Sequence, residues 1–323
     1  MSAPDILDPR QEAEQLLGAG CFARVLEPSP PAVEDGGFFA DDPVAAPAPA
    51  GAQVVSPVPG PDVGRTWDEW LAEPDHTGHA SWAAERWLGA YRRLPPAPAA
   101  LADTRLALHR LAAYVISPAR RRANTRIALR FTRGGFGTPF FGADDQVRVA
   151  GGRLVRGSDE IPITTLSAAA ALVLDGPPDE AWAEGFDVPP MGDPDQELGV
   201  DPDAAAFLGN WFGFAWSVLE ELRSDRSCTD AGRVQLWPEH FDAAFDCLPE
   251  NRRVTFGASP GDAAVPEPYL YVLPWNLDGD DPDLWNAKSF RGAILPFGDL
   301  VDPPDQRGAA LAFLRQRRAA LGS

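Results

Sequence analysis

The chain has 323 residues, enough for about two domains of ordinary size, and its content of 45% hydrophobic and 23% charged residues is typical of a globular protein. Its formal net charge of −19 argues against binding to nucleic acids or to anionic membrane surfaces, because both require a basic protein surface. The cysteines Cys21, Cys228 and Cys247 form no C-x-x-C pair, which argues against a disulfide framework or a zinc ribbon.

Three features of the sequence favour a cytoplasmic location. The few, scattered cysteines are typical of a reduced compartment. The N-terminus has no basic start followed by an apolar run, so we expect no signal peptide. No stretch approaches the roughly 18 uncharged apolar residues of a transmembrane helix.

Residues 1–64 are predicted to be a disordered, acidic tail rich in proline and alanine, because they cannot bury enough apolar surface to offset the entropy of ordering. Within the tail, residues 9–26 place apolar side chains at helical spacing and predict a short helix. That helix either docks on its own domain, frays in solvent, or folds into the groove of a partner. Further helices are predicted for residues 66–71 and 82–93.

Residues 65–323 are predicted to form a single α+β domain in which short antiparallel β-meanders pack on long helices. The glycine-rich stretch from Gly134 to Gly142 joins two β runs, so it indicates a β-turn with aromatic packing, or alternatively a flap over a pocket. Gly151-Gly152 is a signal for a two-residue hairpin turn. The expected elements of this first half are a helix at 101–119, strands at 126–131, 138–141, 147–149, 154–155 and 161–163, and a helix at 165–174.

The same order of elements recurs after a loop rich in proline, aspartate and glycine at 176–202. The expected elements are a helix at 203–223, strands at 233–237, 253–257, 269–274 and 292–295, and a helix at 305–321. Arg126-Ile-Ala-Leu aligns with Arg233-Val-Gln-Leu, and later β runs fall at a common offset. This correspondence predicts an internal duplication with pseudo-repeats at 98–175 and 203–321.

Polar and aromatic side chains concentrate between Val234 and Trp275, among short strands and tight turns. In an antiparallel meander the end of one strand lies beside the start of the next, so side chains from these ends are expected to converge. Polar groups among aromatic ones are typical of a binding pocket. The candidate pocket residues are Trp237, His240, Asp242, Ser259, Asp262, Glu267 and Tyr269.

The chemistry of this region has several readings. His240 beside Asp242 is an arrangement typical of general-base catalysis, with Ser259 as a possible nucleophile. Ser259 lies in S-P-G-D and not in a nucleophile elbow, so it or Asp262 is as well suited to capping a turn. A structural corner with His240 bonded to the backbone is a further alternative. No pair of residues has the spacing of a helical metal site, and we predict no metal.

Three motifs of the same region carry a family resemblance: W-P-E-H-F-D (Trp237 to Asp242), F-G-A-S-P-G-D (Phe256 to Asp262) and P-E-P-Y-L-Y-V-L-P-W (Pro266 to Trp275). They resemble the signature of an uncharacterised actinobacterial protein family, and the similarity covers about residues 65–321. The resemblance implies an actinobacterial origin and a shared architecture. It implies no activity and supplies no catalytic residues.

Two functional hypotheses follow. The favoured one is a non-catalytic protein that binds a small molecule or a protein partner through the Trp237–Trp275 region. The alternative is a hydrolase that uses His240 with Asp242 and with Glu267 or Asp262. A pocket that holds His240 within hydrogen-bond reach of these groups would favour the enzyme.

Overall fold

The computed structural model describes residues 94–132, 134–139, 146–157, 159–225, 227–232, 234–276 and 283–321. The predictions for the tail at 1–64, the helix at 9–26 and the helices at 66–71 and 82–93 lie outside these residues. Within them, helices and two antiparallel sheets confirm the predicted α+β class.

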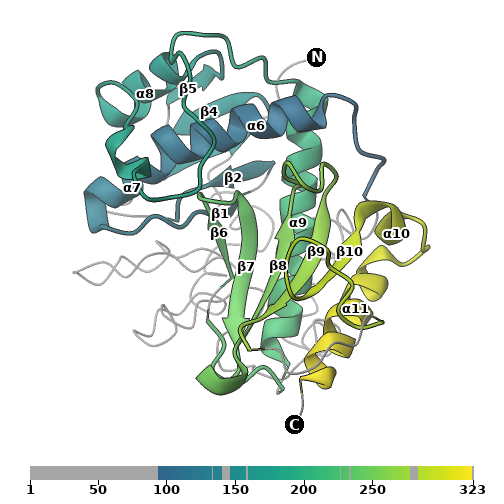
Figure 1. The fold of residues 1–323 in the computed structure, drawn as a ribbon. Coiled ribbons are helices and arrows are strands. Elements are labelled where there is room, and N and C mark those ends of the chain that lie inside the picture. The colour runs from purple at the N-terminus through teal and green to yellow at the C-terminus, as the bar shows by residue number, and fades with distance from the viewer. Residues whose placement is uncertain are drawn as a thin grey trace, which may run out of the picture.

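Each sheet has five strands and is a simple meander, so strands that follow one another in sequence are neighbours in the sheet (Figure 1). The first sheet contains β1 (Arg130–Thr132), β2 (Gly135–Gly137), β3 (Val147–Ala150), β4 (Arg153–Arg156) and β5 (Asp159–Pro162). The second contains β6 (Gln235–Trp237), β7 (Asp242–Cys247), β8 (Val254–Ser259), β9 (Tyr269–Pro274) and β10 (Ala293–Pro296).

The helices precede and follow the meanders. α6 (Leu101–Leu111) continues through a π-helical turn (Ala112–Ile116) into α7 (Ser117–Asn124) ahead of the first sheet, and α8 (Leu166–Leu174) follows it. α9 (Pro202–Ser224) precedes the second sheet, and α10 (Phe297–Val301) and α11 (Gln306–Ala320) follow it. Short 3-10 turns cover Ala181–Ala183 and Glu250–Arg252. In the described part of the chain, no helix is long and apolar enough to cross a membrane.

Local sequence signals explain where three of these helices begin. The side chain of Thr165 accepts a hydrogen bond from the backbone N–H of Ala168 at 3.0 Å, and Asp201 and Asp305 cap α9 and α11 in the same way. Such caps satisfy N–H groups that have no partner inside the helix, and each contributes on the order of 1 kcal/mol.

α9 is the central element of the core, because it packs against strands of both sheets. Its aromatic side chains Trp211, Phe212, Phe214 and Trp216 are almost fully buried. One large cluster of buried apolar residues joins both halves through this helix. The sheets also meet directly, since Leu129 and Leu236 exchange backbone hydrogen bonds of 2.6 and 2.9 Å.

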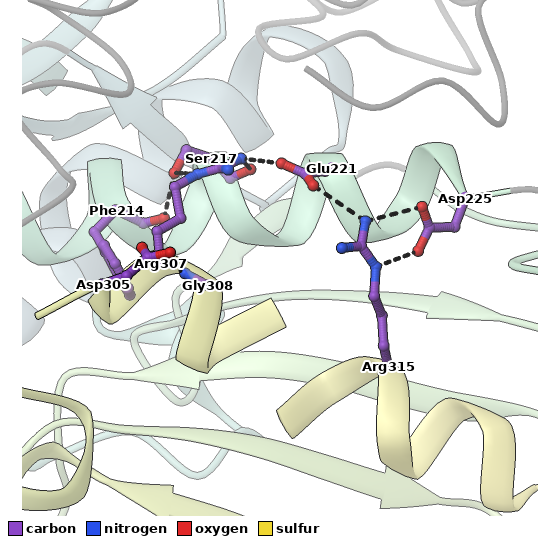
Figure 2. A network of polar contacts seen from close by, with 8 residues as sticks. All are labelled: Phe214, Ser217, Glu221, Asp225, Asp305, Arg307, Gly308 and Arg315. Carbon is purple, nitrogen blue, oxygen red and sulfur yellow. Dashed lines mark hydrogen bonds and ion pairs between the residues drawn. The ribbon is translucent and has the colours of Figure 1, made fainter. Parts of the chain in front are cut away.

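A network of ion pairs fixes α11 against α9 (Figure 2). Arg315 of α11 donates to Glu221 at 3.0 Å and to both carboxylate oxygens of Asp225, at 2.8 and 3.1 Å. Arg307, in the first turn of the same helix, donates to the second oxygen of Glu221. The buried Glu221 carboxylate therefore bridges two arginines of α11.

Most of the predicted elements are observed, but α10 was not predicted, and the described residues of the strand expected at 138–141, Thr138 and Pro139, are not in a strand. In the described part of the glycine-rich stretch Gly134 lies in the turn between β1 and β2, but Gly135–Gly137 forms the strand β2 between β1 and β3. A Cβ atom on Gly135 would lie 2.1 Å from the Val149 carbonyl oxygen, so glycine is needed for the close approach of β3. β7 was also not predicted as a strand.

The predicted duplication remains a prediction. Both sheets are meanders that follow a long helix and precede another helix, which is the element order that the duplication requires. A common origin also requires that residues 98–175 superpose on residues 203–321, strand on strand.

Candidate functional site

A cleft of about 900 Å³ is lined by Asp242, Ser259 and Tyr271, whose neighbours in sequence point into the core toward α9, so the cleft opens on the other face of the second sheet. Its walls include one face of α6, the ends of β7 and β8, strand β9 with the loop before it, and the segment Asp187–Pro190. That segment is held on α6 and its π-helical extension, because Tyr114 donates to the Pro189 carbonyl at 2.7 Å and Arg110 to the Pro190 carbonyl at 3.0 Å. Ser289 and Phe290 complete the lining.

Strand order explains why these ends converge. β6 ends at Trp237 and pairs there with Asp242, the first residue of β7. β8 ends at Ser259, which pairs with Tyr269, the first residue of β9. In an antiparallel meander these four positions fall at one end of the sheet.

The turn between β6 and β7 is anchored by Phe241. Its backbone N–H donates to the Trp237 carbonyl at 2.7 Å, and its φ of 56° is unusual for a bulky residue. The side chain is buried, meets Phe136 and Phe212 edge to face, and stacks on His109 at 5.2 Å between ring centroids. The core thus holds this turn in a strained conformation and fixes the directions of Glu239, His240 and Asp242.

Two polar residues of α6 clamp the loops of the sheet. His109 Nε2 lies 2.9 Å from the Pro238 carbonyl oxygen, so this nitrogen carries the proton and donates. Burial lowers the pKa of His109 to about 4. Arg105, one turn earlier, donates to the carbonyls of Pro266 at 2.6 Å and of Pro260 and Asp262 at 3.4 Å, and burial lowers the pKa of its guanidinium group.

Asp242 and Tyr271 form the centre of the cleft. Asp242 is only 6% exposed, and its Oδ2 accepts a hydrogen bond from the Tyr271 hydroxyl group. Its Oδ1 is shielded from solvent and has no hydrogen-bond partner in the described part of the chain. Burial raises the pKa of Asp242, and burial together with the Asp242 charge raises the pKa of Tyr271 well above its usual value.

Glu239 is a second acid with an unsatisfied oxygen. The side chain is partly buried and lines the cleft, and its Oε2 has no partner among the described residues. Burial raises the pKa of Glu239, while the nearby His240 acts in the opposite direction more weakly. Two carboxyl groups with raised pKa values therefore face the same space.

Ser259 and Asp262 stabilise the loop between β8 and β9. The Ser259 hydroxyl oxygen accepts from the N–H of Gly261 at 3.1 Å, and Asp262 Oδ1 accepts from the N–H groups of Ala264 and Val265 at 2.7 Å. Asp262 Oδ2 accepts from the Tyr269 hydroxyl group at 2.6 Å. Burial and the Asp262 carboxylate raise the pKa of Tyr269. The capping interpretation of these two residues is therefore confirmed.

The cleft contains most of the candidate pocket residues. His240, Asp242, Ser259, Asp262 and Tyr269 line it, whereas Trp237 and Glu267 do not. His240 is exposed, and within the described residues no hydrogen bond joins it to Asp242 or Ser259. The expected backbone contact of a histidine at this corner is made by His109 instead. That the cleft binds a ligand stays a prediction.

Four residues that shape the cleft were missed as candidates: Arg105, His109, Glu239 and Tyr271. Arg105 and His109 lie four residues apart on a helix, and with Ala102 and Leu106 they form one face that lines the cleft. A polar stripe on an otherwise apolar helix was the available signal. Tyr271 is two residues from Tyr269 on the same strand, so both share one face of the sheet.

Groups of three or more histidine, cysteine or acidic side chains arranged to hold a metal ion do not occur among the residues that the structure describes. Cys228 and Cys247 are free and buried. The chain matches no family model, and no curated protein or solved structure is significantly similar to it. The resemblance of its motifs to an actinobacterial family therefore remains a prediction.

Proposed function

We propose that the protein binds a small polar molecule in the cleft, without catalysing a reaction on it. The observation that carries this proposal is the Asp242 carboxyl group, which lines the cleft, is almost fully buried and has one oxygen without a hydrogen-bond partner among the described residues. Buried polar atoms in folded proteins nearly always have hydrogen-bond partners, and a functional role is one of the explanations for an exception.

The energetic cost of this arrangement supports a binding role. A buried acceptor without a partner destabilises a fold by about 1–3 kcal/mol, and more when it is charged. The Glu239 carboxyl group in the same cleft also has a buried oxygen without a hydrogen-bond partner among the described residues. A ligand that supplies the missing donors would recover that free energy on binding.

The wider properties of the chain limit the partner and the location. The net charge of −19 disfavours nucleic acids as partners. We place the protein in the cytoplasm, which fits the two free thiols among the described residues. A small molecule is preferred over a protein partner because the unsatisfied oxygens lie inside a concave site.

The hydrolase alternative has less support. It requires a base oriented toward a nucleophile, yet the Ser259 side chain is buried and accepts a hydrogen bond from the backbone. The proposed acidic partners are also poorly placed, since Asp262 holds its own loop together and Glu267 is exposed and does not line the cleft.

The proposal is tested by ligand-observed NMR with a library of small polar metabolites and the full chain. We expect at least one compound whose binding is weakened about tenfold or more by Asp242→Asn, since a hydrogen bond to a charged group contributes about 1.5–3 kcal/mol. Asp246→Asn is the control, because Asp246 lies on the same strand and face but outside the cleft, bound to Thr255 at 2.6 Å. If every compound that binds is equally sensitive to both variants, or if none binds, the proposed function is wrong.

A further inference from the structure

We propose that the ligand of this cleft is a small organic cation whose ammonium or guanidinium group donates N–H hydrogen bonds to Asp242 and Glu239. This inference rests on the proposed binding function and adds the chemical class of the ligand. It follows from an inventory of hydrogen-bond donors and acceptors around the cleft, from the charges that line it and from its aromatic wall.

The donors that line the cleft are mostly used inside the protein. The hydroxyl groups of Tyr269 and Tyr271 donate to Asp262 and Asp242. The Nε2–H of His109 donates to a backbone carbonyl, and the low pKa of this imidazole keeps it neutral near pH 7. Arg105 directs both terminal nitrogens at carbonyls of the loop between β8 and β9.

Among the described residues that line the cleft, the buried side-chain atoms without hydrogen-bond partners are both acceptors, Asp242 Oδ1 and Glu239 Oε2. An ionised carboxylate only accepts hydrogen bonds, so its complement is a donor. A ligand with carboxylate or phosphate oxygens would place acceptors against acceptors, which is unfavourable.

The charges of the cleft favour a cation over a neutral donor. Five acidic side chains line it: Asp103, Asp187, Glu239, Asp242 and Asp262. The lining also contains Arg105, whose terminal nitrogens are already hydrogen-bonded to backbone carbonyls, and the exposed His240. A cation would also stabilise the ionised forms of Asp242 and Glu239, which burial alone disfavours.

Aromatic and apolar groups beside the acids provide a surface for the body of the ligand. Tyr271 meets Phe290 edge to face at 6.3 Å between ring centroids, and Tyr269 lies 6.2 Å from Tyr271. Leu106, which is 39% exposed, and Val188 line the same cleft. Aromatic faces attract organic cations, which adds to the preference set by the carboxylates.

Two matched series of probes test the class of ligand at neutral pH with the full chain. The first keeps a benzyl group and compares benzylamine, benzyl alcohol, benzyltrimethylammonium and phenylacetate. The second keeps a pentyl chain and compares pentylamine, pentanol, pentyltrimethylammonium and hexanoate. Dissociation constants are measured by NMR titration for the wild type, Asp242→Asn, Glu239→Gln and the control Asp246→Asn, with a thermal unfolding curve for each variant.

We expect a primary amine of at least one series to bind about tenfold or more tightly than its alcohol, quaternary and carboxylate counterparts. That preference should disappear in Asp242→Asn and weaken in Glu239→Gln, while Asp246→Asn keeps it.

If the alcohol or the carboxylate binds as well as the amine and still depends on Asp242, the cleft binds a ligand but the inference of a cation is wrong. Equal binding of the quaternary ion overturns the role of N–H donors, and no Asp242-dependent binding of either amine overturns the inference altogether. Glu239→Gln serves as the second variant if Asp242→Asn does not fold.

Discussion

The ring of Tyr271 occupies the space into which a side chain at Gly257 would project. A Cβ atom built on Gly257 would lie 2.2 Å from Tyr271 Cζ, far closer than two carbon atoms can approach without a bond. The two residues are paired across β8 and β9. Because β8 has no side chain at this point, a tyrosine of β9 reaches across it and bonds to Asp242 of β7.

Gly257→Ala is therefore expected to displace the Tyr271 ring and break its hydrogen bond to Asp242. Overpacking at buried positions costs about 1–3 kcal/mol, so urea unfolding should show a loss of this size. The control is Gly298→Ala in α10, where a Cβ atom meets nothing within 4 Å, so the free energy of unfolding should not fall. Adding Tyr271→Val to Gly257→Ala removes the clash and should restore part of the loss. Equal stability of Gly257→Ala and wild type would show that the ring moves freely.

Asp242→Asn should change how stability depends on pH. Burial raises the pKa of Asp242 in the folded state, so the folded protein holds this proton more tightly than the unfolded chain. Wild-type stability should therefore fall as the pH rises from the unfolded value of about 3.9 through the raised folded value. Asparagine does not titrate, so the free energy of unfolding of the variant relative to wild type should increase across that window.

Glu239, His240, Tyr269 and Tyr271 face Asp242 in both proteins, and the two tyrosines do not titrate in this window because burial raises their pKa values. The measurement is urea unfolding at a series of pH values. A difference that stays constant, or that decreases as the pH rises, contradicts the raised pKa.

His109 should have the opposite effect, because its titration lowers the stability of the protein as the pH falls. Its pKa falls from 6.5 to about 4 in the fold, so the unfolded chain binds the proton more readily between these values. This contribution is complete above pH 6.5 and is lost as the pH falls toward 4, at a cost on the order of 3 kcal/mol.

His109→Gln keeps a donor for the Pro238 carbonyl but does not titrate. We expect it to lose the stacking on Phe241, which lowers stability by an amount independent of pH. The gap between wild type and variant should therefore narrow, or change sign, below pH 6.5. Parallel curves for the two proteins would show that His109 titrates normally.

The sequence allowed most of the fold to be predicted because its signals are local. Thr165, Asp201 and Asp305 stand at the helix starts that they cap, and Gly151-Gly152 forms the turn between β3 and β4. The convergence of Asp242, Ser259 and Tyr269 followed from the geometry of antiparallel strands alone. Asp242 reaches the same end of the sheet as Ser259 because β7 lies between β6 and β8, and that strand was not predicted.

The rest depended on contacts between distant residues. His109 and Arg105 bind loops about 130 and 160 residues away in the chain, and no local pattern shows that α6 lies against them. Gly135 looked like part of a turn because glycine is rare in strands, yet it permits the close approach of β3. The strand Asp242–Cys247 was not recognised because its residues are buried on both faces, except at Asp246. Polar and apolar residues therefore do not alternate along it.

The pairing of α11 with α9 gives the last prediction. Glu221 has a side chain only 6% exposed and bridges Arg307 and Arg315, whereas Asp225 is 19% exposed and, among the described ion pairs, binds Arg315 (Figure 2). Removing one partner of a buried ion pair leaves the other charge uncompensated and costs about 3 kcal/mol or more, while exposed pairs contribute about 0–1 kcal/mol.

Glu221→Gln should therefore lower the free energy of unfolding by about 3 kcal/mol, and Asp225→Asn by about 1 kcal/mol or less. Urea unfolding of the two variants makes the comparison, with Arg315→Met expected to fall between them because it leaves the Arg307–Glu221 pair in place. If Glu221→Gln and Asp225→Asn lower the free energy of unfolding equally, the ion pairs behave as surface pairs, and burial of Glu221 adds nothing to the docking of α11.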